Sequence, residues 1–107
     1  MSYPKSGSIG ATPTLIKAGP GRLTGFDIYN SNVAVAYLQL FDAASVNAVT
    51  LGTTVPIKSI GIPGAGRASR DFSNGMSFAN GLVLAISTTR LGLTGPVATV
   101  DYNFLYE

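Results

Sequence analysis

The stretch AVAYLQLF, residues 34–41, decides the fold class of this 107-residue chain. In an extended strand successive side chains point to opposite faces, and here both faces are apolar except at Gln39. The stretch therefore predicts a strand that is covered on both sides, either by a second sheet and a loop or by another subunit. Such a strand belongs to a layered β protein, and its second face is a possible place of assembly.

On both sides of this stretch, short apolar runs alternate with Gly, Pro and Asn, a pattern typical of an all-β sandwich or barrel. The expected strands are 14–17, 22–29, 34–41, 54–60, 68–72, 76–79, 82–88 and 99–106. Residues 30–32 and Asn74-Gly75 are expected to close hairpins. The prediction is an all-β fold of about eight short antiparallel strands, a jelly-roll-like β-sandwich. An immunoglobulin-like sandwich or a small barrel would leave nearly the same pattern.

The first 13 residues are rich in Ser, Gly and Pro and show no apolar period. We therefore expect residues 1–13 to form a flexible N-terminal arm that becomes ordered on a neighbour. Residues 14–107 are long enough for a single β-sandwich domain and too few for two. Within it, Asp42 could cap one helical turn before Gly52.

Charged residues make up 11% of the chain, well below the roughly 25% of an average soluble domain, and this scarcity favours surface shared with another protein. The net charge is only +2, and Arg67 and Arg70 are the one close pair of cations. A nucleic-acid partner is therefore not expected. No apolar run approaches the length of a membrane span, and no secretory signal is evident, so we expect no membrane partner and synthesis in the cytoplasm.

The chain has no His and no Cys, which removes the usual general bases and the thiolate ligands of metals. Residues 61–69 are close to a phosphate-binding loop, but Arg67 and Ala68 stand where that motif needs Lys and then Ser or Thr. Asp71 beside Asn74 is a weak calcium signature. We expect no enzymatic activity, no catalytic residue, no cofactor and no metal. The competing hypothesis is a carbohydrate-active enzyme that uses two of the five acidic residues, as a glycosidase does.

With the strands placed, several segments resemble small structural proteins of tailed bacteriophages, in particular capsid decoration (cement) proteins. These segments are 27–30, 36–43, 49–56, 73–78 and 79–82, which lie in the chain after Lys17. The resemblance implies a β-sandwich virion protein that binds between major capsid protein subunits, commonly as a homotrimer, and stabilises the shell. It also implies a location on the capsid surface after synthesis in the host cytoplasm.

A second interpretation keeps the virion role but places the protein at the tail or a fibre base, as an adaptor or glycan-binding module. Both interpretations need contact residues on the surface. The candidate assembly contacts come from the arm, the doubly apolar strand and the pair of cations: Tyr3, Lys5, Val35, Tyr37, Arg67 and Arg70.

Overall fold

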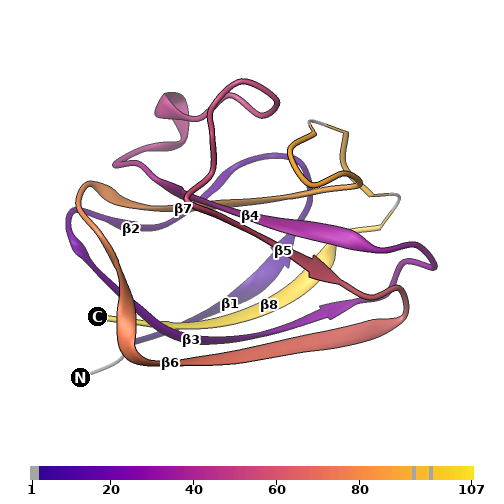
Figure 1. The fold of residues 1–107 in the computed structure, drawn as a ribbon, viewed down its shortest axis with the longest axis horizontal. Helices are drawn as coiled ribbons and strands as arrows, with labels where there is room; N and C mark the ends of the chain where they lie inside the picture. Colours follow the sequence, from indigo (N-terminus) through magenta and orange to yellow (C-terminus); the bar gives the residue numbers. More distant parts are fainter. Residues whose placement is uncertain (1–2, 93, 97) are drawn as a thin grey trace.

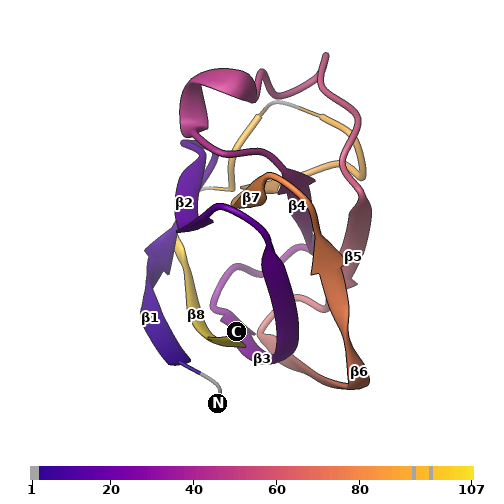
Figure 2. The same ribbon diagram turned by 90° about the vertical axis from the view of Figure 1, so that its left-hand side faces the viewer.

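The computed structural model describes residues 3–92, 94–96 and 98–107, and it shows two four-stranded antiparallel sheets packed face to face (Figures 1 and 2). The strands are β1 (Tyr3–Ile9), β2 (Thr14–Ala18), β3 (Gly21–Asn30), β4 (Ala36–Asp42), β5 (Lys58–Ile62), β6 (Gly66–Phe78), β7 (Gly81–Ser87) and β8 (Val100–Tyr106). The first sheet has the order β1-β8-β3-β6 and the second has the order β2-β7-β4-β5. The chain thus crosses repeatedly between the sheets, which is the eight-stranded jelly-roll arrangement and confirms the predicted fold class.

The hydrophobic core lies between the two sheets. Alternate side chains of β3, β4, β7 and β8 point into it, and Leu23, Leu38, Leu84 and Phe104 are fully buried. The Phe104 ring stacks on Phe26 with 5.4 Å between the ring centroids. This core accounts for the alternation that the sequence shows in these segments.

The outer face of the second sheet is also covered, by two loops of the same chain. Phe41, Val83 and Ala85 form a second buried cluster with Val49, which lies in the loop 43–57 beside the short 3-10 helix η1 (Val46–Ala48). Farther along β4, the Gln39 side-chain amide donates hydrogen bonds to the Ser87 hydroxyl and to the Gly92 carbonyl of the loop 88–99. Both faces of β4 are therefore mostly covered within the chain, so this strand is not itself an assembly surface, whereas Val35 just before it is 41% exposed.

The predicted N-terminal arm is wrong for residues 3–9, because this segment is strand β1 at the edge of the first sheet. It pairs with β8 in an unbroken register from Tyr3 opposite Tyr106 to Ile9 opposite Val100. Ile9 is only 2% exposed, and Gly7 leaves room for the Tyr102 ring. Backbone pairing holds most of β1, which is why its Ser, Gly and Pro side chains gave no apolar period.

Neither expected hairpin is present. The first was expected at residues 30–32, but Asn30 ends β3 in the first sheet and residues 31–35 lead to β4 in the second. Asn74-Gly75 lies inside the continuous strand β6, where the ladder to β3 stops at Asp71 and resumes at Met76. Residues 72–75, which lie between these two pairs, therefore form a bulge. Within it Gly75 has a φ of 75° and adopts a left-handed conformation. The tight turn between β6 and β7 is made at the other Asn-Gly pair, Asn80-Gly81.

Two smaller features also differ from the sequence prediction. The strand expected over 54–60 begins only at Lys58, two residues after Pro56, which cannot donate to a ladder. The helical turn expected near Asp42 is η1, which begins at Val46, and its N-cap is Ser45 and not Asp42. No helix in residues 3–92, 94–96 and 98–107 is long and apolar enough to cross a membrane.

The Asp42 carboxylate at the end of β4 holds the β6–β7 turn. It accepts hydrogen bonds from the backbone N–H groups of Ala79 at 2.9 Å, Asn80 at 2.8 Å and Gly81 at 3.3 Å. Burial alone would raise the pKa of Asp42, but these three donors outweigh it and hold the pKa below its ordinary value. The ionised form therefore fastens β4 to the start of β7.

Replacing Asp42 with asparagine is expected to lower the free energy of unfolding by about 1–3 kcal/mol, because one of the amide's polar atoms cannot accept a hydrogen bond. A lowered folded-state pKa gives stability that is present above the ordinary carboxyl pKa and is lost as pH falls through the folded value. Urea unfolding at neutral and acidic pH should therefore show a smaller acid loss in Asp42→Asn than in the wild type. Asp71→Asn, at an exposed position of β6, is the control, and an equal change in acid sensitivity in both variants would contradict this role.

Candidate docking surface

The exposed apolar side chains gather on one part of the surface, which we call the loop face. It consists of the loops 31–35 and 43–57 and the described residues of the loop 88–99, which lie along the upper side and right-hand end in Figure 1. Val33 is 96% exposed and Val55 is 81% exposed. Six of the eight large exposed hydrophobic residues in the described chain are here: Val33, Val35, Val46, Val55, Ile57 and Leu91.

Charged residues are scarce on the loop face and frequent in the first sheet. The loops 31–35 and 43–57 contain no charged residue, and the loop 88–99 contains only Arg90. The Arg90 guanidinium lies 5.7 Å from the centroid of the Tyr37 ring and donates to the Ser59 carbonyl. The strands of the first sheet, in contrast, carry seven charged side chains: Lys5, Arg22, Asp27, Arg67, Arg70, Asp71 and Asp101. The loop face therefore loses little hydration energy when another protein covers it.

An apolar groove of about 460 Å³ lies at one end of the loop face, between the loops 31–35 and 88–99. Val33, Val35, Pro96 and Ala98 line it. Asn32 joins its two walls, since its side-chain amide donates to the Ala98 carbonyl at 2.9 Å and accepts from the Ala98 N–H at 2.8 Å. The groove is therefore held open by hydrogen bonds within the chain.

Asn30, at the end of β3, supports this arrangement from below and is fully buried. Its side-chain Nδ2 lies 3.0 Å from the Ala34 carbonyl, 3.3 Å from that of Ile62 and 3.2 Å from that of Pro63. Its Oδ1 accepts from the backbone N–H and the side-chain amide of Asn32. A partner that binds here meets a preformed loop, so little conformational entropy is lost on binding.

The structure separates the six assembly contacts expected from the sequence. Val35 lines the groove, and Tyr37 lies next to it on β4, half-buried beneath Arg90. Lys5 is half-buried on β1, whereas Arg67 and Arg70 are exposed on β6 at the opposite edge of the first sheet. Tyr3 belongs to β1, and its side chain lies outside the described part of the structure.

Sequence reasoning missed Val33, Val55, Ile57 and Leu91. Each stands in a segment punctuated by Gly, Pro, Ser or Thr, where an apolar side chain has no strand neighbour to bury it. The sequence signal for these positions was a large aliphatic residue in a loop with one charged residue or none.

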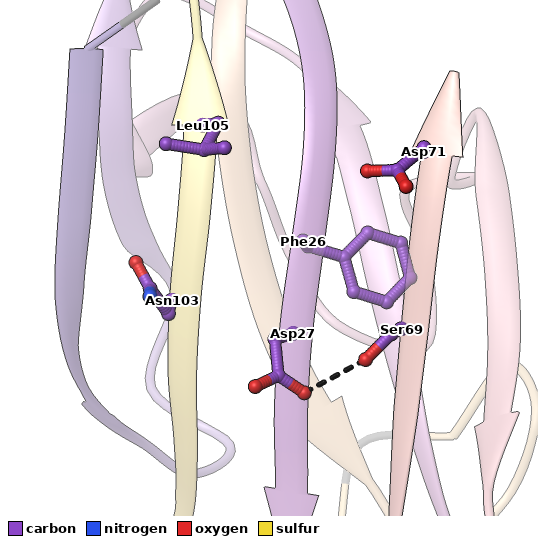
Figure 3. A pocket seen from close by; sticks show the side chains of 6 residues that line it. All are labelled: Phe26, Asp27, Ser69, Asp71, Asn103 and Leu105. Atoms are coloured by element: carbon purple, nitrogen blue, oxygen red, sulfur yellow. Dashed lines mark hydrogen bonds between the residues drawn. The ribbon is translucent and has the colours of Figure 1, made fainter. Parts of the chain in front are cut away.

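The outer face of the first sheet has a shallow depression of about 250 Å³, lined by Asp27, Ser69, Asp71 and Asn103 with Leu105 (Figure 3). Gly25 stands between Asp71 and Leu105 in the sheet, and a Cβ at this position would lie 3.0 Å from an Asp71 carboxylate oxygen. Asp27 accepts a hydrogen bond from the Ser69 hydroxyl at 2.9 Å and lies 3.6 Å from Arg67 Nε. This depression brings together two of the five acidic residues, one of them already paired with a cation.

The chain has a distant structural similarity to a known protein. No family model matches the sequence, and no curated protein matches it either. Among solved structures, the chain is similar to one described as the crystal structure of PirA, with a TM-score of 0.47 and 10% sequence identity over 98% of this chain and 94% of that one. A likeness of this degree carries no information about function.

Proposed function

We propose that this chain is a virion structural protein that decorates a capsid, stabilising the shell by binding major capsid protein subunits through its loop face. The observation that carries the proposal is the division of the surface into a neutral, apolar loop face and a charged first sheet. The capsid as the partner comes from the sequence resemblance to decoration proteins of tailed bacteriophages.

The division of the surface suits a protein that lies between a shell and water. Burying exposed aliphatic side chains such as Val33 and Val55 is favourable, and no buried charge has to be compensated there except Arg90. The charged outer face of the first sheet would remain in solvent and keep the decorated particle soluble.

Self-association as a homotrimer is part of the proposal, because several weak contacts on one assembly act together and gain avidity. Strand β4 does not supply the subunit interface, since both its faces are covered within the chain. Mass measurement of the purified protein tests this part by itself. A monomer at high concentration would remove the trimer and leave decoration by single copies.

Binding to undecorated capsids tests the docking surface. The variants Val35→Lys and Leu105→Lys form a matched pair, because both side chains are 41% exposed, the first in the groove and the second on the outer face of the first sheet. Val35→Lys is expected to weaken co-sedimentation with capsids by about tenfold or more, and Leu105→Lys to leave it unchanged. Equal effects of the two variants, or no binding by the wild type, would overturn the proposal.

The second candidate is an adaptor at the tail or fibre base that binds a glycan, and the depression on the first sheet favours it. Carboxylates and amides such as Asp71 and Asn103 are groups that accept and donate hydrogen bonds to sugar hydroxyls, and Leu105 offers an apolar contact. Binding on a glycan array that is lost in Asp71→Asn, together with labelling of tails in micrographs, would support this function over capsid decoration.

A further inference from the structure

The chain contains two Asn-Gly pairs, which lie in different structural settings and have no part in the proposed function. Asn80-Gly81 makes the β6–β7 turn, whereas Asn74-Gly75 lies in the bulge of β6. Asn-Gly is the dipeptide most prone to spontaneous deamidation, because glycine has no side chain to hinder attack by its own backbone nitrogen. The two pairs have similar neighbours, Ser73 and Ala79, so the folded structure should decide which of them reacts.

We propose that Asn74 is a site of spontaneous deamidation in the folded protein and that Asn80 is protected from it. In this reaction the Gly75 nitrogen loses its proton to solvent base and attacks the Asn74 side-chain carbonyl carbon. The bond from that carbon to the amide nitrogen breaks, and ammonia leaves as a five-membered succinimide forms. Water then opens the ring at either carbonyl, giving aspartate or isoaspartate. The proposal is independent of the proposed function.

The geometry around Asn74 permits the reaction. Its side chain is exposed, and residues 72–75 lie outside the register that joins β6 to β3. The bulge can therefore change its backbone dihedral angles without breaking that ladder. A larger residue is disfavoured at position 75, because φ there is 75° and an added Cβ would lie 2.9 Å from the Arg22 Cβ. The glycine that makes Asn74 reactive is therefore required by the fold.

The geometry around Asn80 prevents it. The attacking atom would be the Gly81 nitrogen, whose N–H is directed at the Asp42 carboxylate, 3.3 Å away. A negative charge beside this N–H opposes its deprotonation. Gly81 is also buried, pairs with Ala18 of β2, and accepts a hydrogen bond from the Ala43 N–H. Ring closure at Asn80 would have to break the turn and the first pairs of β7.

The product at position 74 is compatible with the fold. A new carboxylate there would lie near Arg22, whose Nη1 already donates to the Asn74 carbonyl at 3.4 Å and whose Nη2 is paired with Glu107. The cation compensates the added charge, and the net charge falls from 7 − 5 = +2 to 7 − 6 = +1. Because β6 belongs to the charged first sheet, the loop face is unchanged.

Incubation of the purified protein in mildly alkaline buffer, followed by peptide mapping and isoaspartate labelling, tests the assignment. Asn74 is expected to convert about tenfold or more faster than Asn80 in the folded protein, and the two are expected to convert at similar rates in urea. Asn74→Gln should abolish the more acidic species that isoelectric focusing detects.

Asp42→Asn provides a second measurement, because it removes the carboxylate from Gly81 and should accelerate conversion of Asn80 while leaving that of Asn74 unchanged. If this variant does not fold, the comparison of conversion rates in folded and urea-unfolded wild-type protein still tests whether the fold protects Asn80. Equal rates at both sites in the folded protein, or an Asn74 that reacts only in urea, would overturn the proposal.

Discussion

Replacing Phe104 with alanine is expected to lower the free energy of unfolding by about 3–5 kcal/mol, a large share of the roughly 5–15 kcal/mol typical of a domain. Phe104 is fully buried at the centre of the first sheet and stacks on Phe26 and, edge to face, on Tyr102. Removing its ring leaves a cavity between the sheets that the surrounding strands cannot close. Urea unfolding at neutral pH, followed by tyrosine fluorescence, measures the loss.

The neighbouring residue supplies the control for this prediction. Leu105 follows Phe104 in β8 but points to the outer face, so Leu105→Ala is expected to change the free energy of unfolding by no more than about 0.5 kcal/mol. Phe104→Leu should fall between the two alanine variants. Similar losses at positions 104 and 105 would show that the inner and outer faces of β8 are wrongly assigned.

Replacing Asn30 with alanine is expected to cost roughly 2–4 kcal/mol, because it leaves the carbonyl groups of Ala34, Ile62 and Pro63 without their shared donor in a buried site. The loss should also loosen the loop 31–35, which forms one wall of the groove. Denaturation and hydrogen exchange of residues 31–35 would report both effects.

Asn30→Asp separates the role of the donor from that of the acceptor. This variant keeps an oxygen for the Asn32 N–H but loses the amide hydrogens and places a negative charge against three carbonyl oxygens. It should therefore be at least as destabilising as Asn30→Ala. A mild Asn30→Asp variant would show that the amide donor is not what holds this end of the sandwich.

The strands with an apolar inner face could be predicted from the sequence, because their alternation reflects burial between two sheets. The segments expected over 22–29, 34–41 and 99–106 agree with β3, β4 and β8 to within about two residues. Strand β1 could not be predicted in this way, since its pairing with β8 depends on backbone groups that every sequence has. Similarly, the Asn74-Gly75 pair indicates a glycine with a positive φ, which a bulge and a hairpin turn both need.

The candidate docking surface was predictable only in part. Val35 was expected, but for the wrong reason, because the strand that follows it proved to be covered by the loops 43–57 and 88–99. The residues that do remain exposed lie on those loops, and no periodicity marks them. What the sequence did contain was the absence of charge from 43–57, a signal that concerns solvation and not secondary structure.

The pairing of β1 with β8 also fixes an order of events during synthesis. Among the eight strands, Tyr3–Ile9 is synthesised first, but the strand that it pairs with, Val100–Tyr106, is synthesised eighth. The first sheet therefore cannot be completed before β8 has been made, and β3 needs both β6 and β8 as partners. Because such distant pairings are slow to form, we expect the first sheet to form late, with the second sheet able to gather around β4 and β5 earlier.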